Sequence, residues 1–86
     1  MQHIITYRVS ILPHPQANYL HSRIALSYSA IVSKYSNNTI SILVKERKLR
    51  ATGGWSNNLE KLKEYMNEFL TTRQVAFEII DEVRVD

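Results

Sequence analysis

Apolar and polar residues alternate over residues 4–12, and this period of two predicts a β-strand that is buried on one face. The apolar face of the predicted strand carries Ile5, Tyr7, Val9 and Ile11. Pro13 and Pro15 follow, with His14 between them. Because proline has no N–H group to donate to a sheet, this segment predicts a loop that ends the strand and exposes His14.

The period of the pattern lengthens over residues 21–35, which predicts an amphipathic helix of about four turns. Its apolar stripe recurs at steps of three or four and consists of Leu20, Ile24, Tyr28, Ile31 and Tyr35. Asn18 is a candidate cap for the start of this helix. Ser36, Asn37 and Asn38 tolerate turn conformations and predict its end.

Residues 39–44 alternate again and predict a second strand, whose buried face carries Ile40, Ile42 and Val44. The charged residues 45–48 are interpreted as a hairpin turn, and residues 49–51 as a short third strand at the edge of the sheet. Residues 52–56 contain both glycines of the chain. We interpret them as a connector, because two adjacent glycines alone are a weak motif for a phosphate-holding loop.

A second amphipathic helix follows Asn57, which has the spacing of a capping box with Glu60. The apolar face of this helix consists of Leu59, Leu62, Met66, Phe69 and Leu70. Residues 71–74 are a connector, and a final strand is predicted from the alternation of Val75, Phe77 and Ile79. From Asp81 the chain either frays or extends this strand through Val83 and Val85, and the pattern leaves both possibilities open.

The predicted order of elements is βαββαβ within 86 residues, a length that suits a single domain spanning residues 1–86. Two helices that are each apolar on one face need a common partner surface. The pattern therefore predicts an α+β fold, a two-layer open-faced sandwich with two helices on a four-stranded, mostly antiparallel sheet.

The composition limits the possible chemistry. The chain contains no cysteine, which excludes disulfides and cysteine-ligated zinc. His3, His14 and His21 lack the spacing of a common metal site and have no carboxylate cluster beside them, so we expect no metal and no other cofactor. No apolar run approaches the roughly 20 residues that cross a bilayer, and the N-terminus lacks a signal-peptide pattern. We therefore expect a cytoplasmic protein without membrane insertion.

The net charge is +3 and the sequence pI is about 9.4. Much of the basic charge lies in residues 45–50, a run that could contact nucleic acid or an acidic partner. We favour a solvated turn, because no aromatic residues alternate with the basic ones to stack on bases. Trp55, the only tryptophan, is either a cover on the core or an exposed anchor for a partner, and the core is favoured.

His21 and Arg23 mark the predicted junction between the first loop and the first helix. Unpaired N–H groups and the helix dipole favour an anion at such a junction. Arg23 would add a fixed positive charge and a planar set of donors suited to phosphate. The alternative is a capping or surface histidine with no chemical role.

The segment from Asn18 to Ala25 resembles the active-site signature of HPr, the histidine-containing phosphocarrier family of the bacterial sugar phosphotransferase system. The positions that match are Leu20, His21, Arg23 and Ala25. The resemblance implies that His21 accepts a phosphoryl group from a phosphotransferase enzyme and passes it to a partner protein, and that Arg23 stabilises the phosphate. It also implies that Leu20 and Ile24 contact partners, together with an exposed Trp55. Such a protein is a phosphoryl carrier rather than a stand-alone enzyme.

The sequence departs from the HPr pattern at several positions. Ile24 replaces a proline of the first helical turn, and Tyr19 replaces a small residue. Thr52 falls where many members carry a regulatory phosphorylated serine, and Ser56 is an equally placed hydroxyl. We also expect no counterpart of the family's final helix within these 86 residues.

Two other functions therefore stay open. The first is a non-catalytic adaptor or regulatory module that binds a protein through the face of its first helix. The second, less favoured, is a ferredoxin-like module that binds nucleic acid or a small ligand through residues 45–50.

Overall fold

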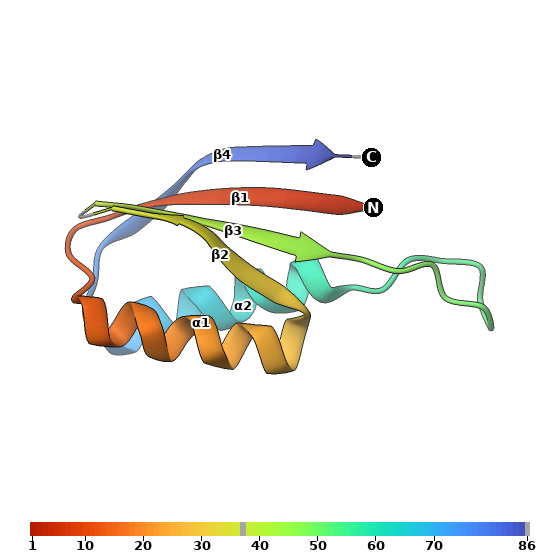
Figure 1. Ribbon diagram of the computed structural model, residues 1–86, viewed down its shortest axis with the longest axis horizontal. Coiled ribbons are helices and arrows are strands. Elements are labelled where there is room, and N and C mark those ends of the chain that lie inside the picture. Colours follow the sequence, from red (N-terminus) through yellow and green to blue (C-terminus); the bar gives the residue numbers. More distant parts are fainter. Residues whose placement is uncertain (37, 86) are drawn as a thin grey trace.

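The computed structural model describes residues 1–36 and 38–85. Asn37, part of the predicted end of the first helix, lies outside the described residues. Within this part of the chain the elements are β1 (Gln2–Val9), α1 (His14–Tyr28), β2 (Ala30–Tyr35), β3 (Thr39–Lys45), α2 (Asn58–Thr72) and β4 (Phe77–Val85). Their order, βαββαβ, is the predicted one (Figure 1).

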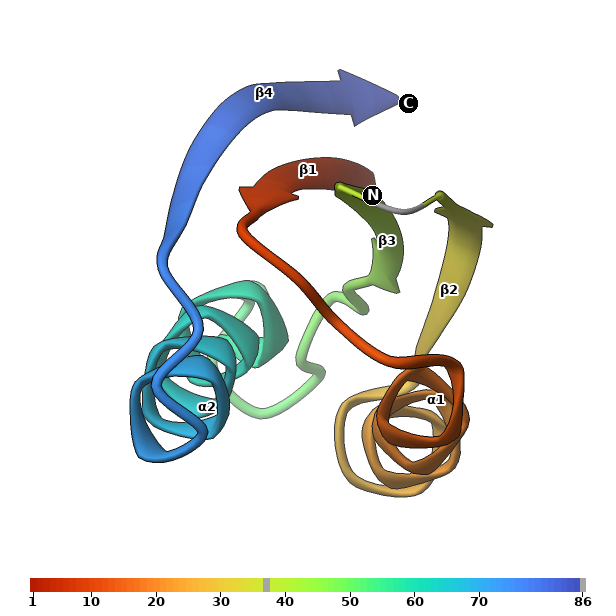
Figure 2. The same cartoon turned by 90° about the vertical axis from the view of Figure 1, so that its left-hand side faces the viewer.

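The strands of the described residues form one sheet in the order β2-β3-β1-β4, and all neighbouring strands are antiparallel. Each strand–helix–strand unit therefore encloses a strand of the other unit, which is the split βαβ arrangement. Both helices lie on the same face of the sheet, and within residues 1–36 and 38–85 the opposite face carries no helix (Figure 2). The predicted two-layer α+β sandwich is confirmed.

The core lies between the sheet and the two helices. Its side chains from β1 are Ile5, Tyr7 and Val9, and those from β3 are Ile40, Ile42 and Val44. The buried face of α2 is the predicted one: Leu59, Leu62, Met66, Phe69 and Leu70. Each fully buried side chain of this kind contributes about 1.5–3 kcal/mol to stability relative to an exposed one. Ile11 is 66% exposed, because β1 ends at Val9 before the predicted strand does.

The first helix begins earlier than predicted. α1 starts at His14 and ends at Tyr28, where Ser29 takes a left-handed conformation with φ 52°. Proline is favoured in a first helical turn, because its missing N–H has no partner there in any case. Pro15 therefore lies in the first turn of α1 and does not extend the loop after β1. Asn18 lies in the second turn of α1 and does not cap its start.

The predicted hairpin and third strand after residue 44 are also wrong. β2 is built from residues 30–35, which the pattern assigned to the end of the first helix. β3 corresponds to the predicted second strand, and residues 45–48 do not turn back into the sheet. Residues 46–57 instead project beyond the end of the sheet before the chain enters α2 (Figure 1). We call residues 46–57 the arm.

The start of α2 is fixed differently from the capping box that the sequence predicts. Asn57 occupies the cap position but makes no side-chain capping hydrogen bond. The Leu59 N–H donates instead to Glu46 Oε1, 3.3 Å away. The other carboxylate oxygen, Oε2, lies 3.0 Å from His3 Nε2. Glu46 therefore ties the base of the arm to both β1 and α2. β4 continues to Val85, so the extended reading of the C-terminal segment is confirmed.

Candidate functional site

His21 lies in the middle of α1 and not at its start, so it has no helix N-terminus beside it. Its ring is exposed, and Nδ1 accepts a hydrogen bond from the Val32 N–H of β2 at 3.2 Å. With His14, Asn18 and Tyr35, His21 lines a hollow of about 300 Å³ between α1 and β2. The side chain of His21 therefore contacts β2, a border strand of the sheet.

Arg23 does not join His21. Two residues along a helix are about 200° apart around its axis. Arg23 accordingly lines a different hollow, of about 240 Å³ between α1 and α2, together with Tyr19, Tyr65 and Arg73. Burial raises the pKa of Tyr65, and a hydrogen bond from Arg23 partly offsets that rise. The phosphate site predicted from His21, Arg23 and a helix start is therefore not assembled.

Two residues expected to contact partners lie in the core. Leu20 and Ile24 are fully buried beneath α1. Both belong to the predicted apolar stripe of the first helix, and that stripe packs into the core. The expectation that Leu20 and Ile24 contact a partner is corrected accordingly.

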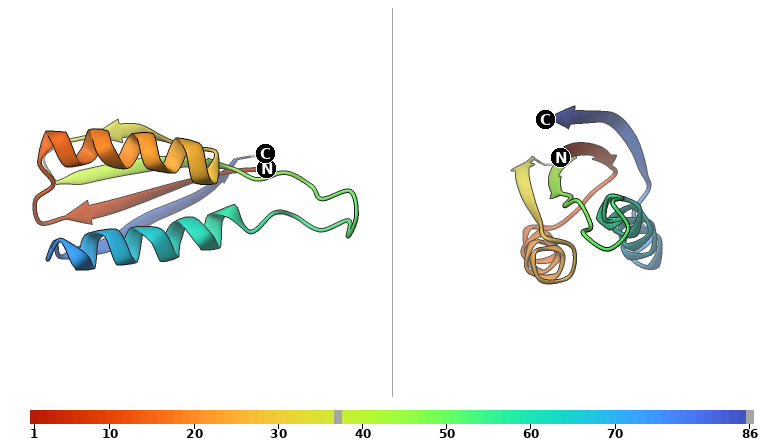
Figure 3. Two further views of the ribbon diagram at one scale, coloured as in Figure 1. Left: turned by 90° about the horizontal axis from the view of Figure 1, so that it is seen from below. Right: turned by 90° about the vertical axis from the view of Figure 1, so that its right-hand side faces the viewer.

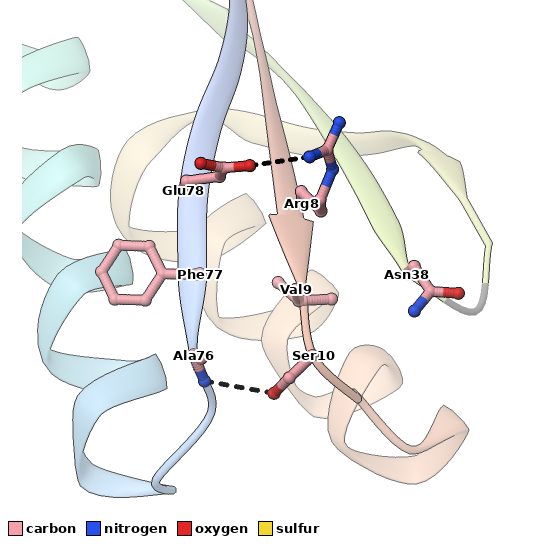
Figure 4. Close-up of a pocket in the computed structure, with 7 residues that line it drawn as sticks. All are labelled: Arg8, Val9, Ser10, Asn38, Ala76, Phe77 and Glu78. Atoms are coloured by element: carbon pink, nitrogen blue, oxygen red, sulfur yellow. Dashed lines mark hydrogen bonds and ion pairs between the residues drawn. The ribbon is translucent and has the colours of Figure 1, made fainter.

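A hollow of about 420 Å³ lies where β1 ends beside β4 (Figure 4). Arg8 and Glu78 form an ion pair at 2.9 Å across its rim. Ser10 Oγ accepts a hydrogen bond from the Ala76 N–H at 3.1 Å, so the floor is held together by the chain itself. Figure 4 shows Phe77 pointing toward the α2 side of β4. The polar groups of this hollow are thus largely paired with one another.

The arm is a short hydrogen-bonded ribbon. Lys48 and Trp55 pair in an isolated antiparallel bridge. Closer to the tip, Leu49 N–H donates to Gly54 O at 2.6 Å, and Gly53 N–H donates to Leu49 O at 2.8 Å. Gly53 makes the turn possible, because its φ of 72° is a conformation that residues with a Cβ rarely adopt. The view from below shows this ribbon extending past both chain ends (Figure 3).

Hydroxyl groups near the tip and at the base reinforce the ribbon. Thr52 Oγ1 accepts a hydrogen bond from the Gly54 N–H at 3.3 Å, and Ser56 Oγ accepts one from the Arg47 N–H at 3.3 Å. Thr52 is exposed. Regulatory phosphorylation at Thr52 or Ser56 stays a prediction, and both hydroxyls have a local role in shaping the arm.

The arm and its base present uncompensated positive charge. The exposed basic side chains are Lys45, Arg47, Lys48 and Arg50. Among the described residues, none of these four forms an ion pair. Glu46, the only acidic residue of the arm, is turned toward His3 and the Leu59 N–H. The arm therefore carries three exposed cations, with Lys45 of β3 as a fourth at its base, and none of the four is ion-paired with a carboxylate of the described residues.

Trp55 lies on the same ribbon and is 47% exposed. The favoured interpretation, that Trp55 covers the core, is wrong, because the arm carries it away from the helices. The bridge to Lys48 places this aromatic ring among the basic residues from which it is separated in sequence. The sequence contains one indication of this pairing, because Lys48 and Trp55 flank a short segment with two glycines that can form a turn.

No helix within the described ranges is both long and apolar enough to span a bilayer. In the same ranges, no three His, Cys, Asp or Glu side chains gather in a group that could hold a metal ion. Comparison with known proteins finds no family model, no curated protein and no solved structure that matches this chain.

Proposed function

We propose that the protein binds nucleic acid through the arm. The observation that supports this is that three exposed cations and an exposed tryptophan lie on one projecting ribbon, with a fourth exposed cation, Lys45, at its base. Lysine and arginine side chains neutralise backbone phosphates without reading sequence. A two-stranded ribbon fits the major groove of duplex DNA, and an aromatic side chain stacks on exposed bases of a single strand.

The exposed tryptophan favours nucleic acid over an acidic protein as the partner. An acidic peptide would satisfy the four cations but offers no extended stack of aromatic rings. Stacking of one base on an aromatic side chain contributes about 1–3 kcal/mol. The combination of Trp55 with Lys48 on the paired strand thus suits a partner that carries both phosphates and flat rings.

The fluorescence of Trp55 provides the test, because the chain contains one tryptophan. We expect mixed-sequence oligonucleotides of about 20 nucleotides to quench it, with an affinity that falls as salt rises. Four phosphate contacts predict a slope of log K against log salt of about −2.8 for single strands and about −3.6 for duplex DNA. Comparing both oligonucleotides identifies the preferred form.

Variants locate the contact on the arm. Lys48→Ala and Arg50→Ala should each make the salt slope shallower by about 0.7 to 0.9, the share of one phosphate contact. The matched control is Lys34→Ala, which removes one exposed cation from β2, away from the arm. Binding that does not depend on salt, or an equal loss in the control, would contradict the proposal.

Phosphoryl transfer at His21 is a second proposal. It is favoured by the exposed imidazole, which opens into the hollow shared with His14 and Asn18. A ring nitrogen would attack the donor phosphorus, forming an N–P bond as the donor P–O bond breaks. Nδ1 would first have to release the Val32 N–H, and Arg23 lies on another side of the helix.

The test of the second proposal is incubation with phosphoenolpyruvate and the general phosphotransferase enzyme. We expect an acid-labile, base-stable adduct that His21→Ala abolishes and His14→Ala retains. An adduct that persists in His21→Ala, or none at all in the original chain, would exclude this carrier chemistry.

A further inference from the structure

β4 forms one border of the sheet and is exposed from Glu78 to Val85. No other strand of residues 1–36 and 38–85 pairs with its outer side. Four large apolar side chains on β4 are 40 to 45% exposed: Ile79, Ile80, Val83 and Val85. β4 contains neither lysine nor proline, residues that often protect a border strand from pairing with another chain. Its outer backbone is thus open to a strand of another molecule.

The face of the sheet without helices carries an apolar row that ends on this border. Ile4 alternates with the buried Ile5 along β1 and therefore points away from the helices. Ile4 lies opposite Leu43 on one side and Val83 on the other, and Leu43 lies opposite Ile31. These four residues, which we call the open-face row, cross all strands of the sheet and reach the outer border at Val83.

The register of β4 determines which partner fits its border. The bulge at Ile80, between the pairs Thr6–Asp81 and Tyr7–Ile79, interrupts regular pairing. Residues 81–85 are left as the regular segment. In an antiparallel pair of two such segments with a two-fold axis at Val83, each Glu82 lies opposite Arg84 of the other copy.

Charge disfavours three of the other axes within this segment. An axis at Asp81, Glu82 or Arg84 puts two like charges opposite each other, which destabilises a strand pair. The axis at Val83 instead pairs valine with valine and joins the open-face rows of both copies end to end. The charge pattern thus disfavours axes at Asp81, Glu82 and Arg84, and the apolar row favours the self-complementary register about Val83.

We propose that two copies of this chain associate through antiparallel pairing of their β4 strands about Val83. The sheets of both copies then form one continuous sheet, with Glu82 and Arg84 paired twice across the junction. This association depends on the C-terminal half of β4 and not on the arm, so it is independent of nucleic-acid binding.

Sedimentation velocity over about 1 to about 200 μM tests the proposal, because the dimer fraction rises with concentration by mass action. We expect a species with twice the 10.0 kDa of one chain. Val83→Lys puts two ammonium groups opposite each other and should raise the dissociation constant at least about tenfold. The control is Leu26→Lys, which makes the same change at an 85% exposed position of α1 and should leave the dimer intact.

Charge reversal tests the register without depending on Val83. Glu82→Arg alone and Arg84→Glu alone each place like charges across the junction and should weaken the dimer. The double variant Glu82→Arg/Arg84→Glu should restore it. Because Glu82 also pairs with Lys63 at 3.0 Å, circular dichroism should confirm that each variant is folded, and Lys63→Ala controls for the loss of that pair.

The proposal is overturned by a monomer throughout the concentration range. It is equally overturned by a dimer that the two single charge reversals leave unchanged. A dimer that is lost on Ile31→Lys but retained in Val83→Lys would show that copies stack through the open faces instead of pairing through β4.

Discussion

The two borders of the sheet are built in opposite ways. β2 has six residues, and α1 packs beside it, with His21 accepting a hydrogen bond from the Val32 N–H. β4 has nine residues, and its outer side faces no other strand of the described chain. Figure 2 shows α1 directly beneath β2, whereas β4 forms the opposite border of the sheet and contacts α2 through the Glu82–Lys63 ion pair.

The difference between the two borders indicates a structural role for His21. A border strand presents N–H and C=O groups that can pair with another chain, and proteins often cover such a border. On β2 the cover is supplied by a histidine side chain, and Lys34 adds an exposed charge. On β4 no such cover is present among the described residues. The histidine that resembles a phosphorylation site is thus also the residue that protects one border.

The largest expected effect comes from detaching the cover of β2. Ile24→Ala removes a fully buried side chain from α1 and should cost about 2–5 kcal/mol of unfolding free energy. It should also loosen α1 and open β2, so that amide exchange at Val32 accelerates more than the loss of global stability explains. Leu62→Ala makes a similar cavity beneath α2 and is the control. Equal effects of both variants on Val32 would contradict a specific covering role for α1.

The next prediction concerns Tyr7, which lies opposite Ile79 and helps to attach β4. Burial, with a smaller contribution from the nearby Glu82 carboxylate, raises the pKa of Tyr7 from 10.0 to about 12. The unfolded chain therefore loses this phenolic proton first as pH rises. The stability associated with neutral Tyr7 is complete below pH 10, and about 2 kcal/mol is lost by pH 12.

Tyr7→Phe separates this dependence from that of the other tyrosines. The Tyr7 hydroxyl is buried and has no hydrogen-bond partner within the described part of the chain. Its removal should therefore be neutral or stabilising by about 1 kcal/mol at pH 7, and it should flatten the fall in stability above pH 10. Urea unfolding across this pH range measures both effects. A variant that is much less stable at pH 7 would show that the hydroxyl is bonded after all.

The sequence predicts the two helices unequally well, for a physical reason. In α2 the apolar residues recur only with a helical period, and both the type of element and its buried face are confirmed. After Tyr28, Ile31 and Tyr35 fit a helical stripe but also fit a strand. The boundary between α1 and β2 depends on Ser29, which has a left-handed backbone conformation. A glycine at this position would have indicated a helix end in the sequence, whereas a serine does not.

The candidate site was harder to predict than the fold. An error of seven residues in the start of α1 moves His21 from a helix terminus to a helix face, and the anion site disappears with it. The arm depends on pairing between residues that are not neighbours in sequence, such as Lys48 and Trp55. Composition reveals the charges of such a surface, but only tertiary pairing reveals that the tryptophan joins them.

A smaller effect is expected from His21→Ala, which removes the acceptor but leaves α1 in place. The Val32 N–H loses one hydrogen bond at an exposed position, so the cost should be about 0.5–1.5 kcal/mol. Hydrogen exchange at Val32 should accelerate, whereas His14→Ala, the control on the same helix face, should leave it unchanged. Unaltered protection of Val32 would remove the structural explanation for His21.

The smallest effect tests whether surface charge, rather than the strand itself, holds β4 to the sheet. The side chains of Arg8 and Glu78 form an ion pair at 2.9 Å but are 63% and 59% exposed. Solvent screens such a pair, so Arg8→Ala should cost no more than about 0.5 kcal/mol. Thermal unfolding of Arg8→Ala and Glu78→Ala measures this, with a double variant to isolate the coupling. A coupling energy well above about 1 kcal/mol would mean that the ion pair holds β4 to the sheet. The two borders would then differ in the kind of interaction that stabilises them, an ion pair at β4 and a hydrogen bond to His21 at β2, and not in how exposed they are.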